Sequence, residues 1–549
     1  MPSDYLRNRT VGGALEECAR LWPRREALVY PGPDKRYTWA ELNAEADRLA
    51  RGLMALGVGK GDRLALWAGN VPRWLTVMYA AAKIGAVLVT ANTFYRQKEI
   101  HYLLEQSRAN FLVLMEGFRG YSYVESIKNI VPELAAGGRG DLASAALPHL
   151  RKIVFLGSPP GPGFHGYEET LALGEGVPEA DFAARRAALD PDDVINMQYT
   201  SGTTGFPKGV MLTHQNIVTN GYWIGRRQNL TEADRICLPV PLFHCFGLVL
   251  GAMAALNHGS AMVVLDVNSP LDILVSIERE KCTAIYGVPT VFISLLEQKS
   301  FSRFDLSSLR TGIMAGAPCP VSTMNQVIGR MGVRDITICY GLTETSPVVA
   351  QTTPEDSLAK RTRTVGRPLP GVEIKLVDPE TGEEVPPGAI GEVRVRGYVT
   401  MKGYFRMPEA TRETIDPQGW LRTGDLGRLD EDGCLVVTGR WKDMIIRAGE
   451  NIYPQEVEEY LRQMPGVSDA QVVGVPSKLH GEELGAFLLV REGGPDLTAK
   501  DVKAYLRPLI SGYKIPRHVK TLSHYPMTAS GKIQKFKLRE MAADLWKRK

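Results

Sequence analysis

The sequence predicts an α/β fold joined to an α+β fold: a large N-terminal domain of parallel α/β sheets with an antiparallel β subdomain, then a small α+β C-terminal domain. Helix-spaced and strand-spaced apolar patterns alternate through the first part of the chain, which favours a parallel sheet covered by helices. A period-two hairpin pattern begins near Gly371, and a separate set of patterns follows Gly439-Arg440. At 549 residues the chain is too long for one ordinary core.

The first part of the chain alternates helices and strands in the order of a βαβ unit. A capping box at Thr38-x-x-Glu41 opens a helix that runs to about Leu56 on an apolar stripe of four-three spacing. Residues 63–67 predict a strand, residues 72–84 a helix opened by proline, and residues 86–90 a second strand. Such a unit builds a parallel sheet.

The later part of the chain predicts two further units. Residues 372–377 and 392–396 form a period-two hairpin around a turn at 378–382, so an antiparallel section covers about 366–439. Beyond it, Pro454 opens a helix, residues 471–475 and 486–490 read as strands, and Thr498 caps a last helix. We therefore predict a domain over 1–439, a charged connector at 440–443 and a second domain over 444–549.

Composition excludes several classes of protein without indicating an activity. Hydrophobic residues make up 44% and charged residues 23%, as in an average globular protein. The 65 Lys and Arg barely exceed the 61 Asp and Glu, so a nucleic-acid binder is not expected. The basic end Lys547-Arg548-Lys549 predicts a solvated tail, while a phosphate-bearing cofactor or a peripheral membrane contact stays open.

Cysteine usage and hydropathy favour a cytoplasmic protein. The seven cysteines are scattered and odd in number, which is typical of reduced thiols. The first residues lack the apolar core of a signal peptide. Residues 238–256 are apolar enough to be scored as a membrane span, but Pro239, Pro241 and His244 favour a broken segment buried in protein. No transmembrane segment is therefore expected.

A glycine- and hydroxyl-rich loop at residues 199–209 carries the strongest chemical signal. Its glycines allow the backbone to approach a ligand, its hydroxyls add donors, and Lys208 adds a mobile positive charge, which together suit a polyphosphate. A flexible surface turn is the alternative. The spacing does not match the P-loop of nucleotide triphosphatases, and an apolar strand rather than a helix follows Gly209.

With this loop the chain resembles the acyl-adenylate-forming superfamily, which includes fatty acyl-CoA synthetases, luciferases and the adenylation domains of peptide synthetases. Six further motifs match in the family's order: Pro241-Leu242-Phe243-His244, Ala315-Gly316-Ala317-Pro318, Tyr340-Gly341-Leu342-Thr343-Glu344-Thr345, Thr423-Gly424-Asp425, Gly439-Arg440-Trp441-Lys442-Asp443 and Ser530-Gly531-Lys532. The resemblance spans nearly the whole chain. It implies an ATP-dependent, AMP-forming acid–thiol ligase whose cofactors and substrates are ATP, Mg²⁺, CoA and a carboxylic acid.

The resemblance implies a nucleotide site with defined catalytic and metal-binding residues. Mg²⁺, a hard cation that prefers oxygen ligands, would lie near Thr200 and Glu344. Lys532 would bridge the carboxylate and the α-phosphate during adenylation, because two anions that react need a cation between them. Residues implied to contact ATP or AMP are Thr200, Ser201, Gly202, Thr203, Thr204, Gly205, Lys208, Gly316, Ala317, Pro318, Tyr340, Gly341, Thr343, Asp425, Arg440 and Lys532.

The chemistry of several side chains fits the role that the resemblance implies for each of them. Asp425, an acceptor when ionised, suits the ribose hydroxyls, with Arg440 supporting the same sugar. Residues 316–318 suit a flat ledge for adenine and Tyr340 a ring that stacks on it, although the tripeptide alone could be a plain turn. His244 would gate the acyl pocket against the nucleotide, while a hydrogen-bonded core histidine is the alternative reading.

The resemblance further implies a mobile C-terminal domain. That domain would first present Lys532 and then turn about Lys442, bringing Gly449 to line the channel for the pantetheine arm of CoA. Two units with separate patterns joined by the charged segment 440–443 fit this arrangement.

The acid itself is predicted less directly. Acetate-specific members of the family carry a Trp where this chain has Gly341, so we expect an open acyl pocket. Residues 220–225, including Trp223, add apolar surface without a charge, and the resemblance implies that His244 gates this pocket. The prediction is a medium- or long-chain fatty acid, with an aryl or cyclic acid and a carrier-protein acceptor as alternatives. A homodimer is left open.

Overall fold

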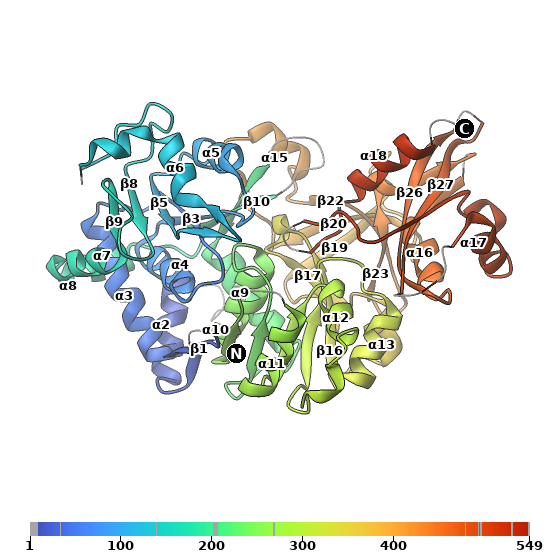
Figure 1. Ribbon diagram of the computed structural model, residues 1–549, viewed down its shortest axis with the longest axis horizontal. Coiled ribbons are helices and arrows are strands. Elements are labelled where there is room, and N and C mark those ends of the chain that lie inside the picture. The colour runs from blue at the N-terminus through green and yellow to red at the C-terminus, as the bar shows by residue number, and fades with distance from the viewer. Residues whose placement is uncertain are drawn as a thin grey trace.

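The computed structural model describes residues 9–32, 34–138, 140–200, 207–266, 269–448, 450–477, 479–491, 494, 497–528 and 531–546. Among these residues, a large N-terminal part contains three large sheets and a two-stranded ribbon, and a smaller C-terminal part lies beside it at the red end of the chain (Figure 1). The mixed architecture confirms the predicted fold class of parallel α/β sheets followed by a small α+β domain.

An eight-stranded sheet forms the first layer. Its strand order is β21 (Gly403–Tyr404), β11 (Lys208–Thr213), β10 (Val194–Thr200), β4 (Val87–Thr90), β3 (Arg63–Trp67), β5 (Phe111–Leu114), β8 (Lys152–Phe155) and β9 (Phe164–Gly166). The run from β10 to β9 is parallel, while β10, β11 and β21 pair antiparallel. The expected βαβ unit is therefore present, with α4 (Pro72–Ile84) as its crossover.

A nine-stranded sheet forms the second layer. Its order is β18 (Arg367–Pro368), β17 (Val348–Gln351), β16 (Asp335–Gly341), β15 (Thr311–Met314), β14 (Ala284–Gly287), β12 (Arg235–Leu238), β13 (Ala261–Val264), β1 (Glu26–Tyr30) and β2 (Lys35–Thr38). Strands β12, β14, β15 and β16 are mutually parallel, so their carboxyl ends open on one edge.

An antiparallel sheet and a mixed sheet complete the main strand architecture. One follows the order β19 (Val372–Val377), β20 (Gly391–Gly397), β22 (Leu421–Leu429) and β23 (Leu435–Arg440), which confirms the predicted hairpin. The other belongs to the C-terminal part and contains β25 (Glu450–Ile452), β24 (Ile445–Arg447), β27 (Gly481–Val490), β26 (Val467–Ser477) and β28 (His518–Leu522), of which β28 pairs parallel with β27. A small ribbon joins β6 (Gly117–Phe118) to β7 (Tyr121–Ser122).

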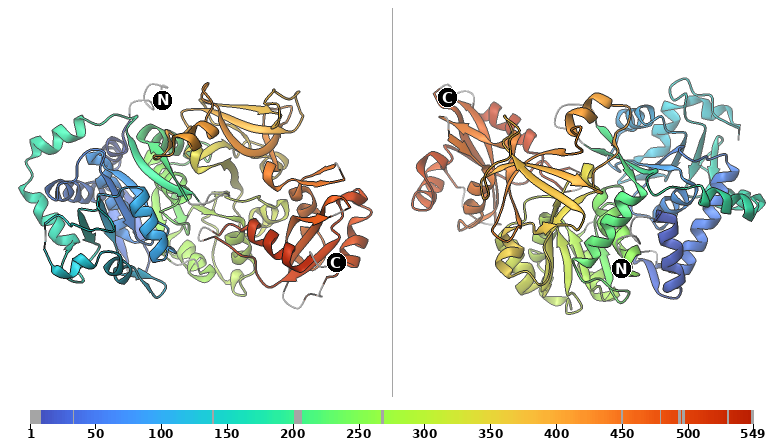
Figure 2. Two further views of the ribbon diagram at one scale, coloured as in Figure 1. Left: turned by 90° about the horizontal axis from the view of Figure 1, so that it is seen from above. Right: turned by 180° about the vertical axis from the view of Figure 1, so that it is seen from behind.

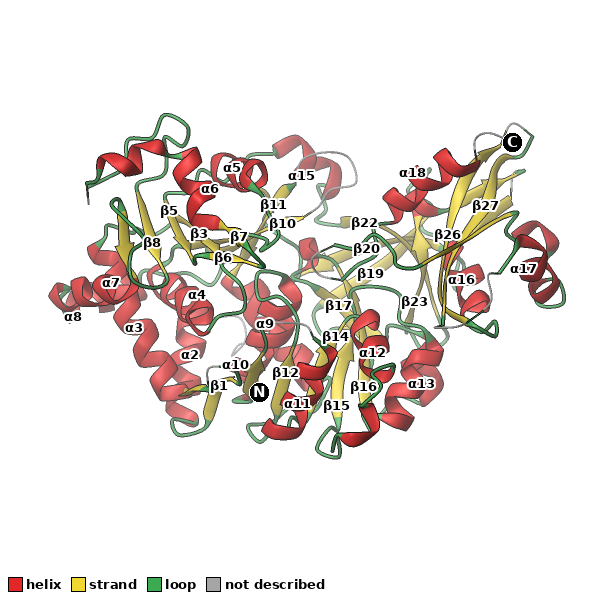
Figure 3. Cartoon of the chain, in the orientation of Figure 1, coloured by secondary structure: helices red, strands yellow, loops and turns green. Residues whose placement is uncertain are grey.

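Helices cover the sheets (Figure 3). The α-helices are α2 (Val11–Leu21), α3 (Trp39–Ala55), α4, α5 (Gln97–Gln106), α6 (Tyr123–Ile130), α7 (Tyr167–Leu173), α8 (Glu179–Ala187), α9 (His214–Arg226), α10 (Ala254–His258), α11 (Pro270–Glu280), α12 (Pro289–Leu296), α13 (Val321–Arg330), α14 (Leu358–Arg363), α15 (Pro408–Thr414), α16 (Pro454–Arg462), α17 (Ala499–Leu506) and α18 (Lys535–Trp546). Single turns are η1 (Pro132–Ala136), η2 (Gly174–Gly176), η4 (Phe301–Arg303), η5 (Thr343–Thr345), η6 (Trp441–Asp443) and η7 (Gly512–Lys514).

Local chemistry explains the helix that was predicted first. The Thr38 hydroxyl accepts a hydrogen bond from the amide of Glu41, and the Glu41 carboxylate accepts one from the amide of Thr38, so the capping box is formed. The stripe of Leu42, Leu49 and Leu53 is buried against the sheet. Burial of this stripe, rather than helix propensity alone, holds α3 in place.

The apolar segment at 238–256 is a buried part of the core. It leaves β12, passes through a loop and forms a π-helix, η3 (Phe246–Met253), before α10. All eight residues of η3 are buried. Within the described ranges, no helix is both long and apolar enough to cross a membrane. The prediction of a broken, protein-buried segment is confirmed.

The C-terminal part has buried clusters of its own. Two clusters contain only residues from 445 onward, whereas the buried members of the other three reach no further than Leu435. Views from above and behind show the two parts in contact along one side (Figure 2). One such contact is the hydroxyl of Thr290, which lies 3.5 Å from the carbonyl oxygen of Gly531.

Candidate active site

The predicted nucleotide residues gather at one edge of the nine-stranded sheet. Residues 316–318 follow β15, Tyr340 and Gly341 end β16, and His244 lies in the loop after β12. Because these strands are parallel neighbours, their carboxyl ends meet and form a crevice of the kind that binds ligands in α/β sheets. The order of the strands thus brings together motifs that are nearly a hundred residues apart.

Asp425 is held at this edge by two donors. Arg440 donates from Nε to Oδ1 at 2.9 Å, and the Tyr340 hydroxyl donates to Oδ2 at 2.8 Å. Asp425 is only 5% exposed, and burial raises the pKa of its carboxyl while Arg440 opposes that shift. Carboxylate oxygens retain further lone pairs, so this group can still accept from hydroxyls of a sugar. The predicted trio of Tyr340, Asp425 and Arg440 therefore forms one hydrogen-bonded group.

Lys532 reaches this group from the C-terminal part. Its amide donates to the Thr528 hydroxyl at 3.0 Å, and its carbonyl accepts from the Thr528 amide at 2.7 Å, so a tight turn presents the side chain. Burial lowers the pKa of the Lys532 amine, and Glu344 and Asp425 are among the charges that act on it. A Cβ atom placed on Gly316 would lie 3.4 Å from Cε of Lys532. The lysine thus lies beside the predicted adenine ledge.

His244 is half-buried and neutral. Burial is the main cause that lowers the pKa of its imidazole to about 3, and the nearby Lys532 adds to the effect. Nδ1 accepts from the amide of Phe246 at 3.1 Å, which leaves the proton on Nε2. Cys245 lies beside it, with its sulfur 3.8 Å from the Thr343 hydroxyl. His244 can therefore shape a wall of the site but is not a charged group at neutral pH.

Glu344 and Lys208 are connected by a residue that the sequence did not indicate. The Tyr404 hydroxyl donates to Oε1 of Glu344 at 2.8 Å, and Nζ of Lys208 lies 4.8 Å from the centre of the Tyr404 ring. Lys208 is paired with Thr200 across β10 and β11. No local pattern marks Tyr404, because Gly403-Tyr404 reads as an ordinary edge strand and its partner is sixty residues away.

Several predicted residues fall elsewhere. Ser201, Gly202, Thr203, Thr204, Gly205 and Gly449 lie outside the described residues. Lys442 lies in η6, where its carbonyl accepts from Arg539 of α18 at 3.0 Å. Pro318 and Gly316 are exposed at the end of β15, and Ala317 between them is half-buried. Gly316 has φ +85°, a conformation that favours glycine.

Gly341 is exposed at the end of β16 and lies beside the main chain of the next strand. A Cβ atom at this position would lie 1.7 Å from the carbonyl oxygen of Pro347, so a side chain would point into the main chain of the neighbouring segment. Close approach of this backbone favours glycine here, and the role of Gly341 in an open acyl pocket stays a prediction. A tryptophan here could not close a pocket without displacing backbone.

The predicted acyl-pocket helix is α9. Trp223 is half-buried and packs edge-on against Tyr222, with ring centres 5.1 Å apart. The amide of Asn220 is fully engaged with β17, donating to the Val348 carbonyl at 2.8 Å and accepting from its amide at 3.1 Å. Asn220 is thus structural, and the segment contributes apolar surface only.

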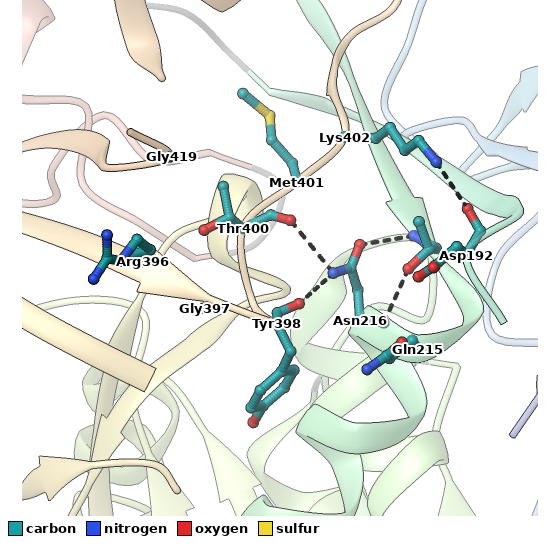
Figure 4. Close-up of a pocket in the computed structure, with 11 residues that line it drawn as sticks. Asp192, Gln215, Asn216, Arg396, Gly397, Tyr398, Thr400, Met401, Lys402 and Gly419 are labelled. Carbon is teal, nitrogen blue, oxygen red and sulfur yellow. Dashed lines mark hydrogen bonds between the residues drawn. The ribbon is translucent and has the colours of Figure 1, made fainter. Parts of the chain in front are cut away.

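A pocket of about 480 Å³ is lined by the segment that carries Thr400 and Met401 and by the start of α9 (Figure 4). Asn216 donates to the carbonyl of Tyr398 and, at 3.4 Å, to that of Thr400, while Lys402 donates to the carbonyl of Asp192 at 3.2 Å. These polar groups are engaged with one another and do not indicate a ligand. The same segment is joined to the main chain at Glu344, because the amide of Met401 donates to the carbonyl of Glu344 at 3.0 Å.

Comparisons with known proteins assign the family. The chain matches the AMP-binding enzyme family over residues 15–405 and the AMP-binding enzyme C-terminal domain over residues 456–532. It is 49% identical over 541 residues to "putative acyl-CoA synthetase YngI" of Bacillus subtilis (strain 168), covering 98% of both chains. It is 40% identical over 543 residues to the mitochondrial medium-chain acyl-CoA ligase ACSF2 of Danio rerio, covering 98% of this chain and 89% of the relative.

Solved structures agree with this assignment. The anthranilate CoA ligase AuaEII in complex with anthranoyl-AMP superposes with a TM-score of 0.86 at 28% identity, covering 99% of both chains. ATP-bound MatB from Rhodopseudomonas palustris superposes with a TM-score of 0.82 at 29% identity, covering 98% of this chain and all of that one. The chain belongs to the AMP-binding enzyme family and is an AMP-forming acid–CoA ligase that uses ATP, Mg²⁺ and CoA.

Proposed function

We propose that the acid activated by this ligase is a medium- or long-chain aliphatic monocarboxylate. The observation that carries the proposal is the absence of charge along residues 220–225 of α9, the predicted pocket wall, and along η3, which packs against α9: none of these described residues is charged. The basic group beside them, His244, is neutral because burial lowers its pKa to about 3. Such walls favour methylenes, each worth roughly 0.8 kcal/mol when buried.

The relatives support an aliphatic substrate. The Danio rerio relative is named a medium-chain acyl-CoA ligase, and the human protein of the same name is 38% identical over 542 residues. An uncharged pocket and a medium-chain relative favour the same class of acid.

In the first half-reaction, Lys532 would offset the repulsion between the substrate carboxylate and the α-phosphate of ATP. Its amine stands in a crevice with Glu344, Asp425 and Arg440, where few water molecules screen its charge. Attack of the carboxylate oxygen forms the acyl–phosphate bond and breaks the bond to pyrophosphate, which leaves as an anion. Thr200 and Glu344 would hold Mg²⁺, which supplies further positive charge to the phosphate oxygens.

The remaining residues would orient the nucleotide. Asp425 would accept from the ribose hydroxyls, since Tyr340 and Arg440 already fix its carboxylate in place. Gly316, Ala317 and Pro318 would face the adenine, and Thr343 and Gly341 would lie along the same edge. Lys208 would contact the outer phosphates together with Ser201, Gly202, Thr203, Thr204 and Gly205.

The second half-reaction would need a turn of the C-terminal domain about Lys442. Lys532 would leave the crevice and Gly449 would approach it, so that CoA reaches the acyl-adenylate. The CoA thiol then attacks the acyl carbon, AMP leaves, and the thiol proton passes to solvent or to AMP.

An aryl or cyclic acid is the second candidate, because AuaEII is an anthranilate CoA ligase and superposes over the whole chain. A carrier protein in place of CoA is the other alternative. All three share the adenylation site.

One experiment separates these possibilities. Pyrophosphate release and AMP formation are measured with fatty acids of 4 to about 18 carbons, aromatic acids and cyclic acids, each with and without CoA. We expect kcat/KM to rise about fourfold per methylene until the pocket is full, as 0.8 kcal/mol implies, and acyl-CoA to appear. Higher kcat/KM for aromatic acids, formation of ADP, or release of acyl-adenylate unchanged by CoA would overturn the proposal.

A further inference from the structure

Tyr404 stands between two groups of the adenylation site that come from different parts of the chain. Its hydroxyl donates to Oε1 of Glu344 at 2.8 Å, and Nζ of Lys208 lies 4.8 Å from the centre of its ring. Among the described residues, no other side chain hydrogen bonds to the Glu344 carboxylate. The second oxygen of that carboxylate is therefore left for a cation, while the first is fixed in direction.

The hydroxyl of Tyr404 acts as a donor at any physiological pH. Tyrosine has an ordinary pKa of about 10, well above physiological pH. The phenol thus stays protonated and its hydrogen bond to the carboxylate is charge-assisted, the stronger class of hydrogen bond. A fixed donor of this kind limits rotation of the carboxylate about its last torsion.

The ring of Tyr404 performs a second task. The Lys208 amine lies over the face of the ring, within the distance at which a cation is attracted by the ring quadrupole. Lysine has a long, flexible side chain, so a contact that favours one position lowers the entropic cost of holding the amine there. Lys208 is the first residue of β11, the strand that follows the glycine-rich loop. The direction of its side chain therefore determines where its positive charge contacts a phosphate.

Tyr404 is held in place by its side-chain packing and by hydrogen bonds of the surrounding main chain. The side chain is 7% exposed and belongs to the main core, and its amide donates to the Thr411 hydroxyl at 2.9 Å. Strand β21 pairs with β11, and the next residue, Phe405, donates from its amide to the carbonyl of Gly209 at 2.8 Å. A residue held on three sides can orient its neighbours without moving itself.

We propose that Tyr404 is a positioning residue for adenylation, whose hydroxyl orients Glu344 toward the metal and whose ring orients Lys208 toward the nucleotide phosphates. This proposal rests on the proposed function, since the roles of Glu344 and Lys208 belong to it. The two tasks use different parts of one side chain, so two substitutions separate them.

The test measures nucleotide binding by titration calorimetry, without acid, in Mg²⁺ and again in EDTA. Tyr404→Phe removes only the hydroxyl, and we expect the Kd of MgATP to rise about tenfold, as loss of a charge-assisted hydrogen bond implies, while the Kd of metal-free ATP stays unchanged. Tyr404→Leu also removes the ring, and we expect the Kd of metal-free ATP to rise about threefold as well. Tyr525→Phe is the matched control, because it loses a buried hydroxyl bond to the Phe487 carbonyl at 3.0 Å far from Glu344.

The outcomes are distinct. Equal weakening of MgATP and metal-free ATP by Tyr404→Phe, or no weakening of either, overturns the proposal. If the leucine variant does not fold, the phenylalanine variant alone decides, with its thermal unfolding compared with that of Tyr525→Phe. Failure of the proposed function would instead appear in the unsubstituted enzyme, as lack of AMP formation from any aliphatic acid.

Discussion

Asp425 and Arg440 face each other across neighbouring strands, with Nε of Arg440 2.9 Å from Oδ1 of Asp425. Arg440 is the last residue of β23 and lies two residues before the predicted hinge at Lys442. The same carboxylate accepts from Tyr340 at the end of β16. One acidic group therefore connects the predicted ribose site to the point where the C-terminal domain begins.

Asp425→Asn should weaken nucleotide binding more than it weakens the fold. The amide keeps the shape but loses the charge that pairs with Arg440, and one acceptor oxygen becomes a donor. We expect the KM for ATP to rise about tenfold, the cost of one charge-assisted hydrogen bond. Asp430→Asn, in the turn between β22 and β23, is the control and should leave the KM for ATP unchanged. An unchanged KM for ATP in the Asp425 variant would refute the ribose role.

Lys532→Ala should separate the two half-reactions. We expect adenylation to fall at least about a hundredfold, as loss of a transition-state charge partner implies, while thioester formation from supplied acyl-AMP is spared. Pyrophosphate release and acyl-CoA formation are measured separately. Lys537→Ala, which removes an exposed lysine of α18, serves as the control. Equal loss of rate in both half-reactions would contradict the prediction that Lys532 acts in adenylation and not in thioester formation.

Adenylation should be lost at alkaline pH earlier than a free lysine would predict. Burial lowers the pKa of Lys532 below its ordinary value of 10.5, and the catalytic form is the charged one. As pH rises through this lowered pKa the positive charge disappears, so kcat/KM, which reports the free enzyme, should decline. Lys532→Arg keeps its charge and should move the decline to higher pH. An alkaline limb at the same pH in both proteins would assign it to another group.

Gly341→Ala should destabilise the fold. The added Cβ atom would meet the Pro347 carbonyl at 1.7 Å, which requires backbone movement. We expect thermal or denaturant unfolding to show a loss of about 1–3 kcal/mol, typical of overpacking. Gly329→Ala is the matched control, because its Cβ atom meets nothing within 4 Å in α13, and it should stabilise by about 0.5–1 kcal/mol. If the two variants are equally stable, the backbone at the start of β17 shifts to accommodate the added methyl group.

The sequence predicted those features that local patterns encode. The helix from Trp39 and the strand from Arg63 carry caps and periodic burial, and both were found as expected. Residues 471–475 and 486–490 were expected as short strands but belong to β26 and β27, which run for eleven and ten residues. Gly474, Pro476 and Glu482 interrupt the apolar pattern there, and backbone pairing between the two strands overrides it.

The site was predictable to the extent that motifs carried it. Asp425, Arg440 and Tyr340 were expected together and are hydrogen bonded. Tyr404 was missed because its contact with Glu344 depends on how β21 pairs with β11, which no pattern of neighbouring residues reports. The close approach of the Pro347 carbonyl to Gly341 was also missed, because a glycine in the sequence does not reveal which backbone lies beside it.

The C-terminal part keeps its buried residues in clusters that share none with the rest of the protein. Regions of a protein that have separate cores can unfold as separate cooperative units, and among the described residues these two parts share no buried cluster. Heating should therefore produce two calorimetric transitions in place of one. Lys532 belongs to the smaller part. Adenylation of the acid should therefore be lost at the transition in which the smaller part unfolds, even while the larger part stays folded.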